Sequence, residues 1–549
     1  MIEPKPLPSR QIHRLASLAR WSLRLVLGLW LILAIIWGVL QFWIVPRINE
    51  WRPELESLAS RSLGIPVTIG ALAAHKDGLM PSFELGDVVL HDPDSQSPAL
   101  HLPKVVVAVS ARSLMTLGVE QIYIESPELT LRRNAEGVVS VAGIALTDKP
   151  DDGSDGNADW VFSQPEIAIR HGRLQWVDEM LAAPPLALNE VDLVLRKKGW
   201  SHSLRLDATP PQDWGQRFTV MGNFKQPLLS VHAGRVDRWS GRAFFDFTHV
   251  DLSQLTQYLP PQSWKLQQGK GAVRAWVDVE RGQPVSAVAD VAVQAFAMQW
   301  KDRPEPLALQ ELKGRLRGSQ RDGYAFSVQG LEFTASDGLH WPRGDFRLSY
   351  FPTGAQEQGR SGEHGELQAD GLDLGIAAQL AQRLPLPPPV LKQLQALQPG
   401  GQLKQVRFSW RGPLEQLESY KASGQLQQLS LRSQPSEEGP HSIGVPGVQG
   451  LSGSFKLDQD KGEATLIKAA EVQRAMMSFP GVFEEPDVPL DLLDANVRWQ
   501  VEKKGQSIKV QVPRLRFANE DTAGQAQASW QTGAGTAAQP HFPGLLDLQ

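Results

Sequence analysis

The chain contains no cysteine among its 549 residues. This absence excludes disulfide bridges, thiol catalysis, iron–sulfur clusters and cysteine zinc sites together. The formal net charge is −5, so the chain also lacks the basic footprint of a nucleic-acid-binding protein. A chain of this length forms several compact domains or one long repetitive domain. Without disulfides, its stability depends on apolar burial and strand pairing.

No catalytic or metal-binding constellation is present in the sequence. The histidines are scattered, and no His-x-x-x-His pair exists. The segment 450–454 (GLSGS) has its second glycine one place too early for a nucleophile elbow, so we interpret it as a turn. The acidic run from Asp151 has Phe162 where a calcium loop needs a carboxylate. We therefore expect no enzyme activity, no metal and no cofactor.

The sequence has a single long apolar run, residues 25–45. As a helix this run is about 30 Å long, which matches the hydrocarbon core of a bilayer. It predicts a transmembrane helix that includes Leu25, Leu31, Ile35, Val39 and Val45. A secretory signal peptide would have a shorter apolar core and a small-x-small cleavage site after it. Here Pro46 and Arg47 follow instead, which favours an uncleaved anchor.

Charge on the two sides of this run predicts its orientation. The basic residues that precede it include Arg10, Arg14, Arg20 and Arg24, whereas the flank that follows is mixed in charge. Basic flanks stay in the cytoplasm. We expect a cytoplasmic tail over residues 1–24, a single membrane pass over 25–45, and the bulk of the chain on the periplasmic side.

Beyond the run, helical spacing over residues 44–58 predicts an amphipathic helix that ends near Leu63. The period then changes to two, and short strands with Gly or Pro turns follow as far as residue 147. Residues 148–159 form an acidic, Gly-rich segment that we interpret as a flexible linker. Residues 160–549 are again mostly strands. The predicted fold is mainly β with a few short helices.

The later strands alternate cleanly between apolar and polar residues, so each presents one apolar face. Helices able to cover that face are few, namely 252–259, 376–384 and 390–397. Such a sheet can close on itself, pack on a second sheet, or leave a trough for an apolar ligand. From the residues alone a packed core is the simpler interpretation. The candidates for a trough lining are Val273, Ala275, Val277, Val497, Val501, Ile508 and Val510.

The strand-rich region also repeats itself. One unit begins at Val250-Asp251-Leu252 and includes Trp276, and a second begins at Leu372-Asp373-Leu374 and includes Trp410. A later element recurs at 309–316 and 448–455, which gives a period of about 120 to 140 residues. We expect the same order in both: a short helix, a turn at Gly271 or Gly401, then a strand that carries the tryptophan. Residues 543–549 look like the opening of a further unit that is incomplete, so we expect the chain to be the N-terminal part of a longer protein.

Several segments, taken in order, resemble the AsmA-like superfamily of inner-membrane-anchored bacterial proteins, and within it the YhdP family. The resemblance is carried by the anchor and by segments 49–70, 83–92, 107–114, 124–137 and 512–521. It implies an elongated, repeating antiparallel β-groove, similar to bridge-like lipid transfer proteins. Such a protein carries phospholipid across the periplasm between the inner and outer membranes. The partners it implies are phospholipid, the inner membrane and other envelope proteins.

Two rival functions are weighed against this one. A periplasmic scaffold that helps outer-membrane proteins assemble would use free sheet edges and needs no apolar trough. An envelope hydrolase would need a nucleophile and a base, and the sequence offers no such pair. A trough predicts continuous apolar lining across all units, whereas a scaffold needs only a closed core and free edges.

Overall fold

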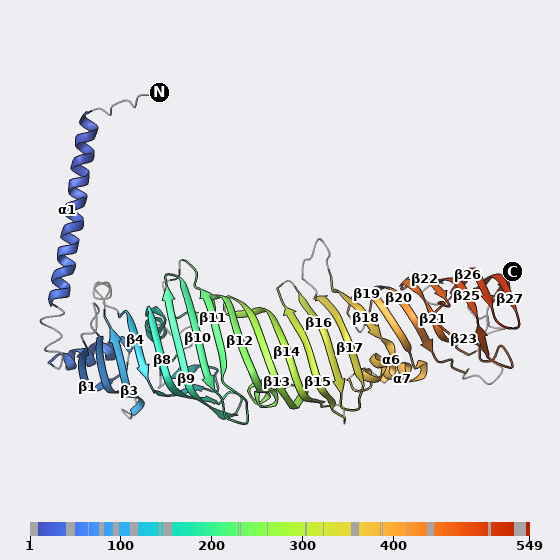
Figure 1. The fold of residues 1–549 in the computed structure, drawn as a ribbon, viewed down its shortest axis with the longest axis horizontal. Helices are drawn as coiled ribbons and strands as arrows, with labels where there is room; N and C mark the ends of the chain where they lie inside the picture. The colour runs from blue at the N-terminus through green and yellow to red at the C-terminus, as the bar shows by residue number, and fades with distance from the viewer. Residues whose placement is uncertain are drawn as a thin grey trace. The chain divides into compact units, whose positions relative to one another are not determined.

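The structure is a computed structural model, and the part of the chain that it describes comprises residues 9–39, 50–63, 65–75, 82–91, 98–109, 119–141, 144–145, 156–228, 230, 232–260, 262–301, 305–321, 323–352, 362–384, 386, 388–413, 416–435, 444–502, 507–531 and 545–549. It is mainly β with few helices, as the sequence predicts (Figure 1). Contacts divide it into two units. Unit 1 is Met1–Phe245 with Val279–Gln283, and unit 2 is Asp246–Asp278 with Pro284–Gln549.

Unit 1 begins with helices and continues as a sheet. Its helices are α1 (Ser9–Val39), α2 (Arg52–Leu63) and α4 (Gly156–Ser163). Its strands are β1 (Val67–His75), β2 (Ser82–His91), β3 (Pro98–Ala108), β4 (Gln121–Glu125), β5 (Glu128–Arg133), β6 (Val139–Val141), β7 (Ile144–Ala145), β8 (Glu166–Asp178), β9 (Ala183–Lys198), β10 (Ser201–Thr209) and β11 (Phe218–Lys225), with β12 (Ser240–Asp251) at the division between the units.

The sheet of unit 1 departs from the expected all-antiparallel pattern at one strand. β8 pairs in parallel with both β4 and β5, in the registers Ile122↔Ile167 and Leu129↔Leu174. A parallel return needs a long crossover connection, and the segment between β5 and β8 supplies it. In sequence, the segment 148–159 therefore falls between strands of one sheet and not between two domains. Its residues 156–159 belong to α4, not to a flexible linker, and residues 148–155 lie outside the described residues.

Helices α2 and α4 supply apolar side chains to the core of unit 1. Leu55 and Ala59 of α2, and Trp160 of α4, pack against a cluster whose centre includes Ile69, 1% exposed. α2 ends at Leu63, which confirms the end predicted from the sequence. At the end of β8, Asp178 is buried and accepts hydrogen bonds from the guanidinium of Arg133, at the end of β5, and from the backbone N–H of Leu181.

Unit 2 is a succession of longer strands with short helices between some of them (Figure 1). Its helices are α5 (Leu252–Leu255), α6 (Leu374–Ala381) and α7 (Pro388–Leu397). Its strands are β13 (Trp264–Glu280), β14 (Gln283–Trp300), β15 (Leu307–Ser319), β16 (Tyr324–Ala335), β17 (His340–Phe351), β18 (His364–Asp373), β19 (Gly400–Arg411), β20 (Ser419–Leu431), β21 (Gly447–Asp458), β22 (Lys461–Ile467), β23 (Ala475–Ser478), β24 (Asp487–Leu490), β25 (Leu492–Glu502), β26 (Ser507–Ala518), β27 (Ala523–Gln531) and β28 (Leu545–Leu548).

From β14 to β22 each strand pairs antiparallel with the next, and β22 then pairs with β25. The series continues antiparallel from β25 to β28. The hairpin β23–β24 pairs instead with the start of β21. The segment 450–454 is thus part of a strand, β21, and the sequence interpretation of it as a turn is wrong.

The predicted repeat is present in its order of elements. Asp251 ends β12 and caps α5 through the backbone N–H of Ser253, and Asp373 ends β18 and caps α6 through that of Ile376, each at 3.0 Å. A strand carrying a tryptophan follows in both cases. The predicted turns are wrong, however, because Gly271 lies within β13 and Gly401 within β19.

Candidate functional site

One face of the unit 2 sheet is apolar along an unbroken row of paired residues. Residues that pair directly across antiparallel strands point to the same face. The row runs from β14 to β22 and on through β25 to β27: Ala287, Gly318, Phe326, Leu348, Leu367, Phe408, Ala422, Leu457, Gly462, Trp499, Val510 and Trp530. We call this set the apolar row.

The adjacent row of pairs points to the opposite face and is polar. It comprises Arg317, Ser327, Arg347, Gln368, Arg407, Ser423, Lys456, Glu463, Arg498, Gln511, Ser529 and Asp547. We call this set the polar row. On every strand from β15 to β22 and from β25 to β27, the sheet of unit 2 therefore places apolar residues on one face and polar residues on the other.

The apolar row is not covered like a protein core. Phe326 is 48% exposed, Leu348 39% and Leu367 36%, although these three residues are neighbours on adjacent strands inside the sheet. Large contiguous apolar surfaces of this kind are uncommon on soluble proteins and mark sites of interaction with apolar partners. This surface is the candidate functional site.

Toward one end of the same strands the apolar face is covered. Phe333 and Ala335 of β16 are 6% and 0% exposed, and they belong to a cluster against which Ile376 and Leu380 of α6 pack. A second covered cluster is centred on Leu451, 0% exposed, and includes residues of the hairpin β23–β24. The short helices and the hairpin thus close one margin of the apolar face and leave the row itself open.

Register shifts separate the covered part from the open part. They fall between Val328 and Leu331 on β16, between Lys404 and Arg407 on β19, and between Leu426 and Leu429 on β20. Further shifts occur where β26 pairs with β25 and with β27. Bulges of this kind bend a strand and increase its twist. On the strands that carry them, these shifts bend the strand where the covered part meets the open apolar row.

Aromatic rings in this region lie over glycines of the neighbouring strand. A Cβ added to Gly462 would lie 2.0 Å from the ring of Trp499, and one added to Gly365 would lie 2.2 Å from the ring of Trp410. The rings therefore lie along the sheet and do not stand up from it. Because the rings lie flat against the neighbouring strand, they do not interrupt the apolar surface.

The structure brings four of the seven predicted lining residues to one face. Val497 and Val501 of β25 share that face with Ile508 and Val510 of β26, because Val501 pairs with Ile508 and Val510 pairs with Trp499. Val510 is a member of the apolar row. All four are half-buried or, in the case of Ile508, 37% exposed.

The three candidates on β13 lie on the face opposite its charged residues. Asp278 accepts a hydrogen bond from Ser286 at 2.7 Å, and Arg274 pairs with Asp246 at 3.1 Å. Alternation along the strand directs Val273, Ala275 and Val277 to the other side, where all three are half-buried. Sequence reasoning missed Phe326, Leu348 and Leu367, although alternation in Tyr324-Ala325-Phe326 and Phe346-Arg347-Leu348 could have indicated them.

The predicted anchor falls largely in α1. Leu25, Leu31, Ile35 and Val39 are 72%, 63%, 58% and 42% exposed, and Val45 lies outside the described residues. Arg10, Arg14, Arg20 and Arg24 also lie in α1. In the part of the chain that the structure describes, no helix has the length and apolarity needed to cross a membrane. The span over 25–45 thus remains a prediction.

Within the described ranges, no cluster of three or more His, Asp or Glu residues could hold a metal ion. Two carboxyl groups on the polar face have lowered pKa values because neighbouring side chains donate hydrogen bonds to them. A hydrogen bond from Arg315 lowers the pKa of Asp290, and hydrogen bonds from Asn496 and Arg498 lower the pKa of Glu463. These carboxyls are ionised at neutral pH.

The fold and this face define a mainly β protein whose sheet carries a partly open apolar surface backed by a polar face. The chain belongs to the YhdP family, because the family model described as YhdP protein matches residues 7–549. No curated protein matches the chain. No solved structure matches it either.

Proposed function

We propose that this protein binds phospholipid acyl chains along the apolar row and moves them between the inner and outer membranes. The observation that carries the proposal is the exposure of Phe326, Leu348 and Leu367 in the interior of a sheet. Membership of the YhdP family is compatible with such transport.

Energetics favour a lipid as the occupant of this surface. Each methylene removed from water contributes about 0.8 kcal/mol of binding free energy. An acyl chain that lies across more strands of the apolar row therefore binds more tightly. The row continues from β14 to β27 with only apolar residues and glycine. An acyl chain can therefore change position along it without passing a charged side chain.

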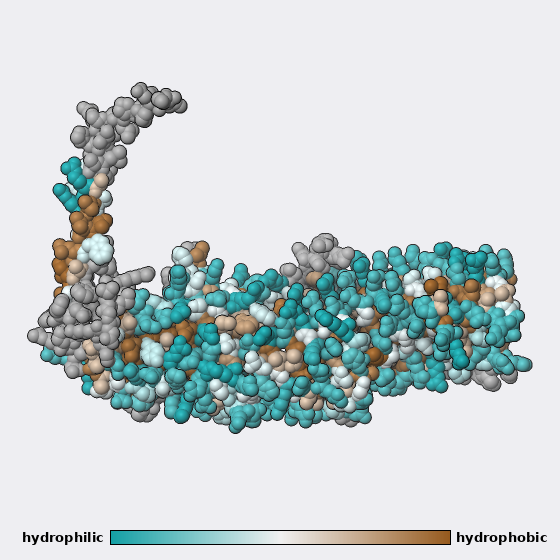
Figure 2. Space-filling model, in the orientation of Figure 1, coloured by the Kyte–Doolittle hydropathy of each residue, from teal (hydrophilic) through white to brown (hydrophobic). Residues whose placement is uncertain are grey.

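We further propose that α1 anchors the chain in the inner membrane with its N-terminus in the cytoplasm. The support is the exposure of its apolar side chains, which appear as brown patches on part of the helix in Figure 2, and the basic residues before them. A reporter fused after Gly70 or after Gly412 is expected to be active only in the periplasm. Cytoplasmic activity at either fusion would reverse the orientation.

Photo-crosslinking at matched pairs of neighbouring positions tests lipid binding. A crosslinker at Val510 or Val277 is expected to capture phospholipid, because these side chains lie on the apolar face. One at Lys509 or Asp278, a single residue away on the opposite face, is expected to capture none. Equal capture at both members of a pair, or none at any position, would contradict the proposal and favour a scaffold that works through its sheet edges.

A further inference from the structure

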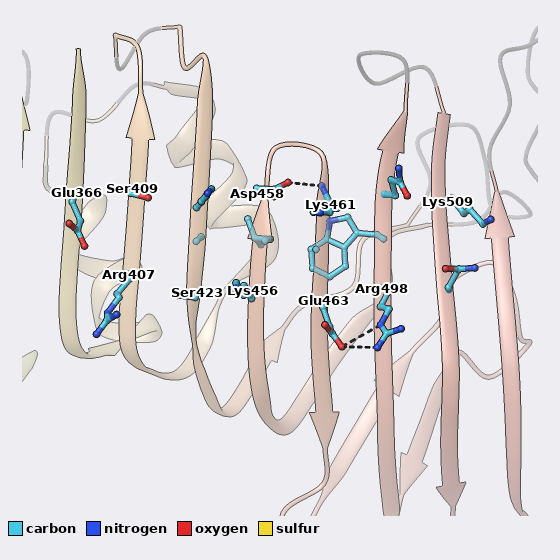
Figure 3. Close-up of a pocket in the computed structure, with 17 residues that line it drawn as sticks. Glu366, Arg407, Ser409, Ser423, Lys456, Asp458, Lys461, Glu463, Arg498 and Lys509 are labelled. Atoms are coloured by element: carbon cyan, nitrogen blue, oxygen red, sulfur yellow. Dashed lines mark hydrogen bonds and ion pairs between the residues drawn. The ribbon is translucent and has the colours of Figure 1, made fainter. Parts of the chain in front are cut away.

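The polar face of unit 2 is hollowed between β18 and β26. The hollow has a volume of about 810 Å³ and receives side chains from every paired strand in that span (Figure 3). Most of its lining side chains belong to the face opposite the apolar row, and Ala422, Leu457, Gly462 and Trp499 of that row complete the lining.

Each of six successive paired strands contributes one basic residue to this hollow. From β19 to β26 they are Arg407, Lys421, Lys456, Lys461, Arg498 and Lys509. Only three carboxylates line it, those of Glu366, Asp458 and Glu463. With strands about 4.8 Å apart, the basic residues form a ladder about 24 Å long across the strands.

Two of the three carboxylates lie in the middle of the ladder, and the third, Glu366, lies on β18 beside the strand of Arg407. Glu463 pairs with Arg498 at 3.3 Å and is close enough to Lys456 for its pKa to be lowered further. Hydrogen bonds from the backbone N–H groups of Asp460 and Lys461 lower the pKa of Asp458, and the positive charges of Lys461 and Lys421 lower it further.

The basic residues at the two ends of the ladder have no charged residue directly across from them on the neighbouring strands. Arg407 has Gln368 and Ser423 as its cross-strand neighbours, and Lys509 has Gln500 and Gln531. Neither basic side chain makes an ion pair with another described residue. The hollow thus holds excess positive charge, with unpaired cations at both ends.

We propose that this hollow binds an extended acidic peptide segment of a partner protein, laid across the strands from Arg407 to Lys509. The length fits, because about seven extended residues span 24 Å. A single small anion would occupy little of this volume, and a flat membrane surface would not enter a concavity. The backbone of these strands is already paired within the sheet, so recognition falls to the side chains, and charge complementarity selects the partner.

The test measures binding of a fluorescein-labelled peptide of about ten alternating Glu and Ser residues, long enough to cross the hollow, to the full chain in neutral detergent. The peptide with Gln in place of Glu is the ligand control. The double variant R407Q/K509Q removes the two end charges, neither of which is in an ion pair within the described part of the chain. The double variant R317Q/R347Q removes the same charge from the polar row outside the hollow and is the matched protein control.

We expect the acidic peptide to bind, the Gln peptide not to bind, and R407Q/K509Q to weaken binding about tenfold at low salt. R317Q/R347Q is expected to bind as the unmodified chain does, and salt is expected to weaken binding throughout. Equal weakening in both double variants would overturn the proposal. So would displacement of the peptide by phosphatidylglycerol in mixed micelles with the same detergent at equal charge concentration, which would assign the hollow to anionic lipid.

Discussion

A carboxylate placed on the apolar row should abolish lipid binding without unfolding the chain. The change L348D is best suited to this test, because Leu348 lies between Phe326 and Leu367 on the adjacent strands and all three are partly exposed. In the absence of lipid the new carboxylate can reach water. Beside acyl chains it would be an unpaired charge in an apolar environment, which costs several kcal/mol.

The effect on folding follows from the exposure of this side chain. Leu348 is 39% exposed, so its replacement removes only part of the 1.5–3 kcal/mol, roughly, that full burial of leucine provides. We expect L348D to lower the free energy of unfolding by about 1–2 kcal/mol. Leu309 lies in the covered cluster and is 5% exposed. The change L309D buries an unpaired charge there and should cost more than about 4 kcal/mol.

The assay combines thermal unfolding with phosphate analysis of lipid that co-purifies with the chain. L348D is expected to melt a few degrees lower and to lose its lipid, whereas L309D is expected to lose its fold. The matched control is R347D, which changes the neighbouring residue on the polar face and should keep both fold and lipid. If L348D is folded and retains as much lipid as the unmodified chain, the apolar row does not hold lipid and the reasoning fails.

Two further predictions concern stability, and denaturant unfolding checks both. G462V should destabilise unit 2 by about 1–3 kcal/mol, because its side chain would displace the ring of Trp499. G318A in the same row should cost nothing measurable, since no atom lies within 4 Å of the added Cβ; equal costs would refute the ring packing. D178A should destabilise unit 1 by about 2–3 kcal/mol by leaving Arg133 without its carboxylate. Burial alone would raise the pKa of Asp178, but hydrogen bonds from Arg133 and Leu181 hold it below its usual value. The stability that Asp178 contributes is therefore complete above a pH of about 4 and is lost as the pH falls through the lowered pKa, so a stability that is flat with pH down to acid unfolding would contradict this role.

Alternation along a strand was sufficient to predict which side chains share a face. The pattern separates Val510 from Lys509, and the register places Val510 with Trp499 and Trp530 on the apolar face. A period of two fixes the face because a strand has only two sides. It carries no information about what covers that face, and so sandwich core and open trough could not be distinguished from the sequence.

Glycine was the least informative signal. Gly401 uses its freedom at φ +91° to form a register shift inside β19, where a turn was expected. Gly271 lies within a strand, and glycine is needed there because a Cβ would lie 2.1 Å from the carbonyl oxygen of Ala292. Both glycines serve close approach or bending within the sheet, and the residue type alone does not distinguish these uses from a turn.

The parallel pairing of β8 was also beyond prediction. β4 and β5 are short, and their alternation is compatible with a neighbour in either direction. Their partner follows only after the crossover through β6, β7 and α4. The acidic composition of residues 148–159 suggested a boundary between domains, but composition describes solvation and not the path of the chain.

The measurement that tests the central claim most directly is mass spectrometry of the lipid bound to the full chain after extensive exchange into lipid-free detergent. The account predicts glycerophospholipid in at least equimolar amount, lost in L348D and retained in R347D. A chain that is folded, carries no lipid, and gives no crosslink to lipid at Val510 or Val277 would contradict it.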